Sequence, residues 1–151
     1  MYKRIFVPVD GSRVSNLGLH EAIRLAKFHR GGLRLIHVVD EFVVTPFLEG
    51  GRYADDIQNA FRANGKKILR KAEASVRKHG LTVDSVIFEI VGGRAADIIV
   101  AQAKKWHADI LVIGTHGRRG ISRLVMGSDA EQIIRIAPAP VLLVRSRTSR
   151  G

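Results

Sequence analysis

This sequence of 151 residues contains no cysteine. Without cysteine the chain forms no disulfide and no thiolate metal site, which fits a reducing compartment. No apolar run approaches the length of about 18 residues that suggests a membrane-spanning helix. The opening apolar stretch, Ile5–Val7, is too short for the core of a signal peptide. We therefore expect a soluble, cytoplasmic protein.

Acidic residues are scarce relative to basic ones. The 14 Asp and Glu against 25 Lys and Arg give a net charge of +11, which keeps nucleic acid among the candidate partners. Much of this charge recurs at helical spacing in one segment, at Lys66, Lys67, Arg70, Lys71, Arg77 and Lys78. The pattern indicates either the solvated face of an amphipathic helix or a surface for nucleic acid.

Several signatures of catalysis and phosphate binding are also missing. The P-loop pattern G-x4-G-K-[ST] and the dinucleotide pattern G-x-G-x-x-G are both absent. The run from His20 to Arg24 would need a second histidine to form a zinc-protease motif, and no G-x-S-x-G elbow exists. These absences favour a module that binds its ligand and turns it over slowly or not at all.

Strand and helix patterns alternate along the chain, which predicts one α/β domain over residues 1–145 and a basic, disordered tail at 146–151. Apolar runs predict five strands, at Arg4–Val9, Leu33–Val39, Thr82–Val91, Ile110–Ile113 and Val141–Val144. Apolar residues at helical spacing predict four helices, at Ser15–His29, Asp56–His79, Ala95–His107 and Ser128–Ala137. The alternation favours a doubly wound, mainly parallel sheet with helices on both faces.

Two irregular segments are candidates for ligand contact. Residues 41–55 have no clear period and form either a lid or a surface loop whose aromatic residues pack on the core. The second segment follows the predicted strand at Ile110–Ile113, and its glycines are spaced Gly114-x2-Gly117-x9-Gly127-Ser128. Glycines expose backbone N–H groups, and the helix predicted from Ser128 adds the positive end of its dipole. This arrangement suits a phosphate-bearing ligand.

The spacing resembles the nucleotide-binding signature of the universal stress protein family, G-x2-G-x9-G-[ST], at every specified position. The segments KRIFVPVDGS (3–12), HVVD (37–40) and APAPVLLVR (137–145) are similar to the family's first strand and turn, second strand end and closing strand. The resemblance implies a sheet in the order 3-2-1-4-5 that binds ATP or another adenine nucleotide. It also implies a homodimer through the last strand, Val141–Val144.

The family's binding residues are carried over by position. The adenine and ribose side would be lined by Pro8, Val9, Asp10 and Val38. The ribose and phosphates would be wrapped by Gly114, Thr115, His116, Gly117, Arg118, Arg119 and Gly120. The terminal phosphates would meet Gly127, Ser128 and Asp129.

Each assignment has a structural alternative. Asp10 either caps a turn or contacts the nucleotide. Ser128 forms the pattern S-x-x-E with Glu131, so its hydroxyl caps the helix or binds phosphate. Arg118, Arg119 and Arg123 pair with phosphate oxygens or are solvated loop charges. His116, a lone loop histidine, is more typical of a polar surface residue than of a general base.

Asp129 departs from the family, which usually has a small or aliphatic residue at this position. An aspartate in the first helical turn favours the helix dipole, but beside Ser128 it would repel the terminal phosphates. We therefore expect either a Mg or Mn ion bridging Asp129 and the phosphates, or a preference for AMP or ADP over ATP. The leading hypothesis is a dimeric nucleotide-binding stress or signalling module. The alternative is a basic nucleic-acid-binding protein of the same fold.

Overall fold

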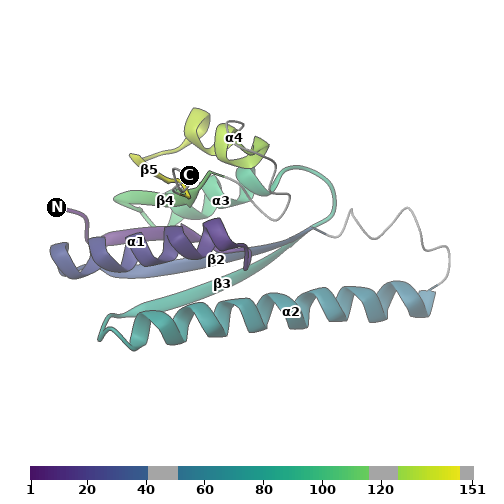
Figure 1. Ribbon diagram of the computed structural model, residues 1–151. Coiled ribbons are helices and arrows are strands. Elements are labelled where there is room, and N and C mark those ends of the chain that lie inside the picture. Colours follow the sequence, from purple (N-terminus) through teal and green to yellow (C-terminus); the bar gives the residue numbers. More distant parts are fainter. Residues whose placement is uncertain (41–50, 116–125, 147–151) are drawn as a thin grey trace, which may run out of the picture.

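Five parallel strands form the sheet of the computed structural model, which describes residues 1–40, 51–115 and 126–146, with the backbone alone at 51–54 (Figure 1). The strand order is β3-β2-β1-β4-β5, and all four neighbouring pairs are parallel. The strands are β1 Arg4–Pro8, β2 Gly32–Asp40, β3 Val83–Ile90, β4 Ile110–Gly114 and β5 Val141–Val144. The helices are α1 Arg13–His29, α2 Gly51–Arg77, α3 Ala95–Lys105 and α4 Ser128–Ile136. The doubly wound α/β fold and its expected strand order are confirmed.

Two helical layers cover the two faces of the sheet. α1 and α2 pack on one face, and α3 and α4 pack on the other (Figure 1). Successive side chains of a strand point to opposite faces, so Ile5 and Val7 of β1 enter the α1/α2 core while Phe6 enters the α3/α4 core. All three side chains are fully buried. Burial on both faces explains why the strands are continuous apolar runs.

Helix α2 begins at Gly51, so the prediction of an irregular segment is wrong over residues 51–55. Its first turns extend past the ends of the strands (Figure 1). A helical turn without a sheet beneath it has no core to face and needs no periodic apolar residues, which is why no helical pattern is present in this part of the sequence. The rest of the predicted lid or surface loop, residues 41–50, lies outside the described residues, as does the tail at 147–151.

Gly65 lies where α2 approaches the sheet most closely. A Cβ atom at this position would lie 2.7 Å from Cδ2 of His37 and 2.9 Å from Cδ1 of Ile87. The helix therefore accepts the propensity loss of about 1 kcal/mol that glycine brings relative to alanine. Most other element ends differ from the predicted ones by one or two residues, as helix and strand termini usually do. Within the part of the chain that the structure describes, no helix is long and apolar enough to cross a membrane.

Candidate functional site

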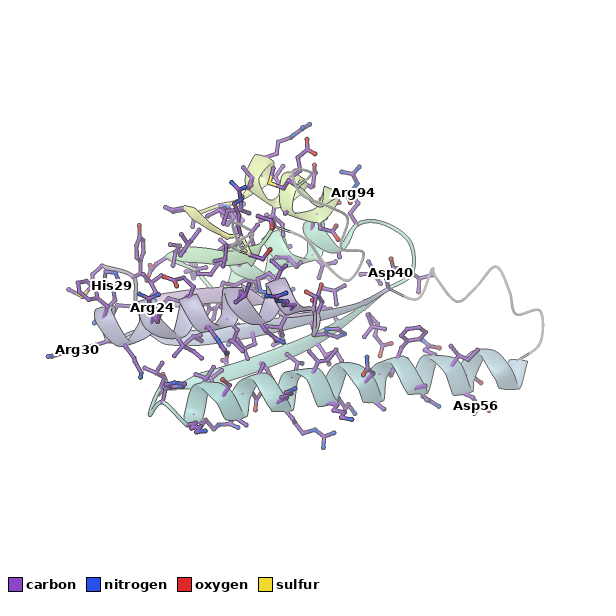
Figure 2. All side chains as sticks on the ribbon, viewed as in Figure 1. Arg24, His29, Arg30, Asp40, Asp56 and Arg94 are labelled. Carbon is purple, nitrogen blue, oxygen red and sulfur yellow. The ribbon has the colours of Figure 1, made fainter. Side chains whose placement is uncertain are left out.

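The strand order reverses between β1 and β4, and ligands of doubly wound sheets bind beyond the carboxyl ends of the strands at such a switch point. β1 ends at Pro8 and leads into the turn that contains Asp10, while β4 ends at Gly114. β2 pairs with β1, so its last residues, Val38 to Asp40, approach the same edge; Figure 2 labels Asp40 there. The fold thus brings predicted site residues from three strands to one edge of the sheet.

The turn after β1 is held by side-chain hydrogen bonds. The backbone N–H of Ser12 donates to Oδ1 of Asp10 at 2.8 Å, and the backbone N–H of Asp10 donates to Oγ of Ser15 at 3.1 Å. Ser12 caps α1, because its Oγ accepts from the backbone N–H of Ser15 at 3.2 Å. The turn role predicted for Asp10 is confirmed, although Ser12 rather than Asp10 is the helix cap. Contact between Asp10 and a nucleotide stays a prediction.

Val9 is built into the core beneath this turn. Its side chain is buried in the α1/α2 core, and its N–H donates to the carbonyl oxygen of Ile36 at 2.8 Å. Its carbonyl oxygen lies 2.8 Å from Nδ1 of His37, and since a carbonyl only accepts, Nδ1 carries the hydrogen. A nucleotide could therefore meet Val9 through the main chain alone. His37 was missed at the sequence level, although a histidine inside an apolar strand was a signal for a buried polar contact.

Gly114 is required by close packing between β4 and α1. A Cβ atom there would lie 2.8 Å from Cγ1 of Val14 and 3.0 Å from both the carbonyl carbon and the carbonyl oxygen of Val14. Such distances to backbone atoms leave no room for a side chain. The first glycine of the motif therefore has a structural role of its own, whatever it does for a ligand.

Thr115 and Gly127 join the two ends of the glycine-rich loop. The buried Thr115 donates its N–H to the carbonyl oxygen of Val144 at 3.0 Å and accepts from the N–H of Gly127 at 2.8 Å. The residues between these ends are only partly described. The predicted site residues that lie outside the described ranges are His116, Gly117, Arg118, Arg119, Gly120 and Arg123.

The capping box predicted at Ser128 is wrong. Gly127 is the N-cap of α4, no side chain caps the helix, and the N–H of Glu131 donates to the carbonyl oxygen of Gly127 at 3.0 Å. The hydrogen bond from Gly127 to Thr115 fixes the helix start one residue earlier than the capping pattern needs. Ser128 is therefore the first helical residue, is exposed, and does not use its hydroxyl as a cap.

The amino end of α4 is suited to an anion. Ser128, Asp129 and Ala130 precede the first bond of the helical ladder, and their N–H groups have no acceptor among the described residues. Such N–H groups and the helix dipole together favour negative charge. No cluster of three metal-ligating side chains occurs in residues 1–40, 55–115 and 126–146. The described part of the site therefore suits an anion and contains no such cluster of metal-ligating side chains.

Comparison with known proteins identifies what this arrangement resembles. The model of the Universal stress protein family matches residues 1–145. A universal stress protein of Methanocaldococcus jannaschii is 35% identical over 149 residues, which cover 96% of this chain and 83% of that protein. The relatedness therefore extends over nearly the whole chain, not over the glycine motif alone.

Two solved structures of similar proteins contain nucleotides. One is a universal stress protein from Archaeoglobus fulgidus in complex with dAMP, 27% identical, with a TM-score of 0.66 and coverage of 95% of this chain and 98% of that one. The other is a universal stress protein in complex with cAMP, 25% identical, with a TM-score of 0.70 and coverage of 97% and 99%. Both bound molecules are adenine nucleotides.

Proposed function

Because this chain belongs to the universal stress protein family, we propose that it binds an adenine nucleotide at the edge between β1 and β4. The observation that carries the proposal is that the Asp10 turn after β1 and the hydrogen-bonded pair Thr115 and Gly127, between β4 and the amino end of α4, lie at the carboxyl edge where the strand order reverses. The dAMP and cAMP complexes of similar proteins support the same ligand class.

A thermal-shift series with ATP, ADP, AMP and cAMP tests this proposal. A ligand that binds only the folded state stabilises it by RT ln(1 + [L]/Kd), about 2.7 kcal/mol at a hundredfold excess over Kd. For a domain of this size each 1 kcal/mol raises Tm by about 2 to 4 °C. We expect Tm to rise with at least one adenine nucleotide and to stay unchanged with the pyrimidine nucleotide that carries the same phosphate group. No rise with any of the four at millimolar concentration would remove the proposal.

Slow or absent hydrolysis is part of the proposal. The sequence has no P-loop lysine, and the described part of the site offers main-chain N–H donors that suit phosphate binding. We infer a binding or signalling module of the stress response, located in the cytoplasm. Turnover of several ATP per second with Mg would contradict this assignment.

A homodimer through β5 completes the proposal. β5 is the last strand of the sheet, and its four apolar residues are half-buried in the single chain. Ile134 and Ile136 of the preceding helix, α4, are 44% and 40% exposed. Apolar strand edges are usually paired or covered, because they otherwise promote aggregation. Light scattering at micromolar concentration should give twice the mass of one chain, and a monomer would contradict the β5 interface.

A further inference from the structure

The two helical layers differ in charge. α1 and α2 contain ten Lys and Arg against four Asp and Glu, whereas α3 and α4 contain three of each. The layers lie on opposite faces of the sheet, so the helices on one face carry a net charge of +6 and those on the other none (Figure 1). A charge concentrated in one helical layer is an electrostatic footprint for a polyanion, which a uniformly distributed charge is not.

Four cations on α2 account for much of this asymmetry. Lys66, Lys67, Arg70 and Lys71 are exposed, and none forms an ion pair with a residue that the structure describes. Lys66 with Arg70, and Lys67 with Lys71, are like-charge pairs one turn apart, which weaken a helix. The helix dipole does not account for them, because its effect is confined to the last turn, where only Arg77 lies.

An exposed aromatic ring lies at the end of α1, the other helix of this layer. Phe28 is 84% exposed, and its ring meets that of His29 edge-on, with the centroids 5.0 Å apart. Arg24, Lys27 and Arg30 are exposed around it, and Figure 2 shows Arg24, His29 and Arg30 at this end of the helix. Basic side chains around an exposed ring are the combination that holds single-stranded nucleic acid, with phosphates on the cations and bases on the ring.

We propose that the basic helical surface, formed by Arg24, Lys27, Phe28 and Arg30 of the α1 end and by Lys66, Lys67, Arg70 and Lys71 of α2, binds single-stranded nucleic acid. The two helices contact each other and share one core, so they form one continuous layer. Both helices run antiparallel to the strands, so the α1 end lies toward the amino edge of the sheet (Figure 1). The α2 cations flank Ile68, whose Cδ1 would lie 3.2 Å from a Cβ atom at Gly11, in the turn beside Asp10. The α1 end is therefore remote from the proposed nucleotide site, whereas the α2 cations lie nearer to it.

The composition of α2 argues against a membrane as the partner. A helix that lies in a membrane interface buries bulky apolar residues along its length. The exposed apolar residues that the structure describes on α2 are Ala60, Ala63 and Ala74, which are too small for that role. The exposed cations, by contrast, extend over more than a turn of helix, or roughly 7 Å along its axis between Lys66 and Lys71.

Fluorescence anisotropy with a labelled oligothymidylate of about 20 nucleotides tests the proposal, since several bases must reach the surface at once. The test variant carries Lys67→Gln, Arg70→Gln and Lys71→Gln. The matched control carries Lys104→Gln, Lys105→Gln and Arg135→Gln, which remove the same charge from exposed positions on the opposite layer. Each lost phosphate contact should reduce the slope of log K against log salt by about 0.7, so the test variant should lose about 2 and the control close to none.

A third variant separates stacking from charge. Phe28→Ala should weaken single-strand binding by about five- to 150-fold, the range expected for one lost base–aromatic stack, and leave binding to a duplex of equal length unchanged. Phe28 is exposed, so the variant should fold, which a cooperative thermal transition would verify.

The proposal is overturned by no binding, by equal losses in the test and control variants, by an unaffected Phe28→Ala, or by preference for anionic vesicles. The outcome of the oligonucleotide test is separable from the outcome of the adenine-nucleotide test. A protein that binds the oligonucleotide but shows no thermal shift with any adenine nucleotide would refute the proposed function and leave this inference standing, and the reverse result would do the opposite.

Discussion

The two edges of the same sheet are held together in different ways. At the carboxyl edge, β4 and α1 approach so closely at Gly114 and Val14 that no side chain fits between them. At the amino edge, the carboxylate of Asp109 accepts two backbone N–H bonds, from Lys3 and Arg4, both at 2.8 Å. Nζ of Lys3 donates to the carbonyl oxygen of His29, at the end of α1, at 2.7 Å.

This difference predicts how each edge fails. The packing of β4 against α1 at the carboxyl edge depends on backbone proximity, so an added methyl group should disrupt it. The Asp109 contact at the amino edge depends on an ionised side chain, so it should respond to charge removal and to acid. At the switch point, the amino end of α4 keeps main-chain N–H groups of the kind that an anion site requires.

Gly114→Ala should give the largest effect. The new Cβ would press on backbone atoms of Val14, and overpacking of this kind costs about 1 to 3 kcal/mol, or up to roughly 10 °C in Tm. Gly18→Ala is the matched control, because a Cβ at Gly18 would lie 3.5 Å from the N atom of Gly114, in ordinary contact. The control should be neutral or more stable by up to about 1 kcal/mol through helix propensity. Equal effects of the two substitutions in chemical denaturation would contradict the close-packing argument.

Gly117→Val separates binding from folding. Gly117 lies outside the described residues, and its role is inferred from the motif. If its backbone approaches phosphate, a branched side chain blocks the ligand and removes the stabilisation of about 2.7 kcal/mol expected at a hundredfold excess over Kd. Without nucleotide, the variant should unfold as cooperatively as the parent. Retention of the full nucleotide-induced shift would rule out the phosphate loop as the binding element.

The fold was predictable because its signals are local and repeated. The strand run at Ile110–Ile113 and the spacing of Leu19, Ala22, Ile23 and Ala26 in α1 reflect burial that the structure confirms. The start of α2 was not predictable from the spacing of apolar residues, because the first turns of this helix have no sheet beneath them.

The site was only partly predictable. Motif spacing predicted Gly114 as a site residue but could not reveal its packing against Val14, a contact between residues distant in sequence. The pattern S-x-x-E at Ser128 was misleading, because the hydrogen bond between Gly127 and Thr115 decides where α4 begins. The hydrogen bond from His37 to Val9 likewise depends on the pairing of β2 with β1, which the periodicity of the sequence does not reveal.

Asp129→Val tests the effect of charge at the carboxyl edge. Asp129 is exposed in the first turn of α4. At about 6 Å from a phosphate charge and an effective dielectric near 20 to 40, repulsion is on the order of 1 to 3 kcal/mol, tenfold or more in affinity. We expect the parent to need Mg or Mn for ATP, or to prefer AMP or ADP, and the variant to lose that distinction. Titrations with and without metal check this, and metal-free ATP binding as tight as AMP binding in both proteins would contradict it.

Asp109→Asn tests the amino edge and should have the smallest effect. The hydrogen bond from the backbone N–H of Arg4 is the main cause that lowers the pKa of Asp109 below its ordinary value of 3.8, and the bond from Lys3 adds to it. The carboxylate is partly exposed, so we expect the substitution to cost about 1 kcal/mol at neutral pH. A lowered pKa means that the stabilisation is fully present above pH 3.8 and is lost as the pH falls through the folded-state value. Denaturant titrations at pH 7 and below pH 4 should therefore show a parent that is more stable than the variant at pH 7 and a gap that closes in acid. A difference in stability between parent and variant that stays constant across this pH range would mean that packing of the Asp109 side chain, and not its charge, stabilises the edge.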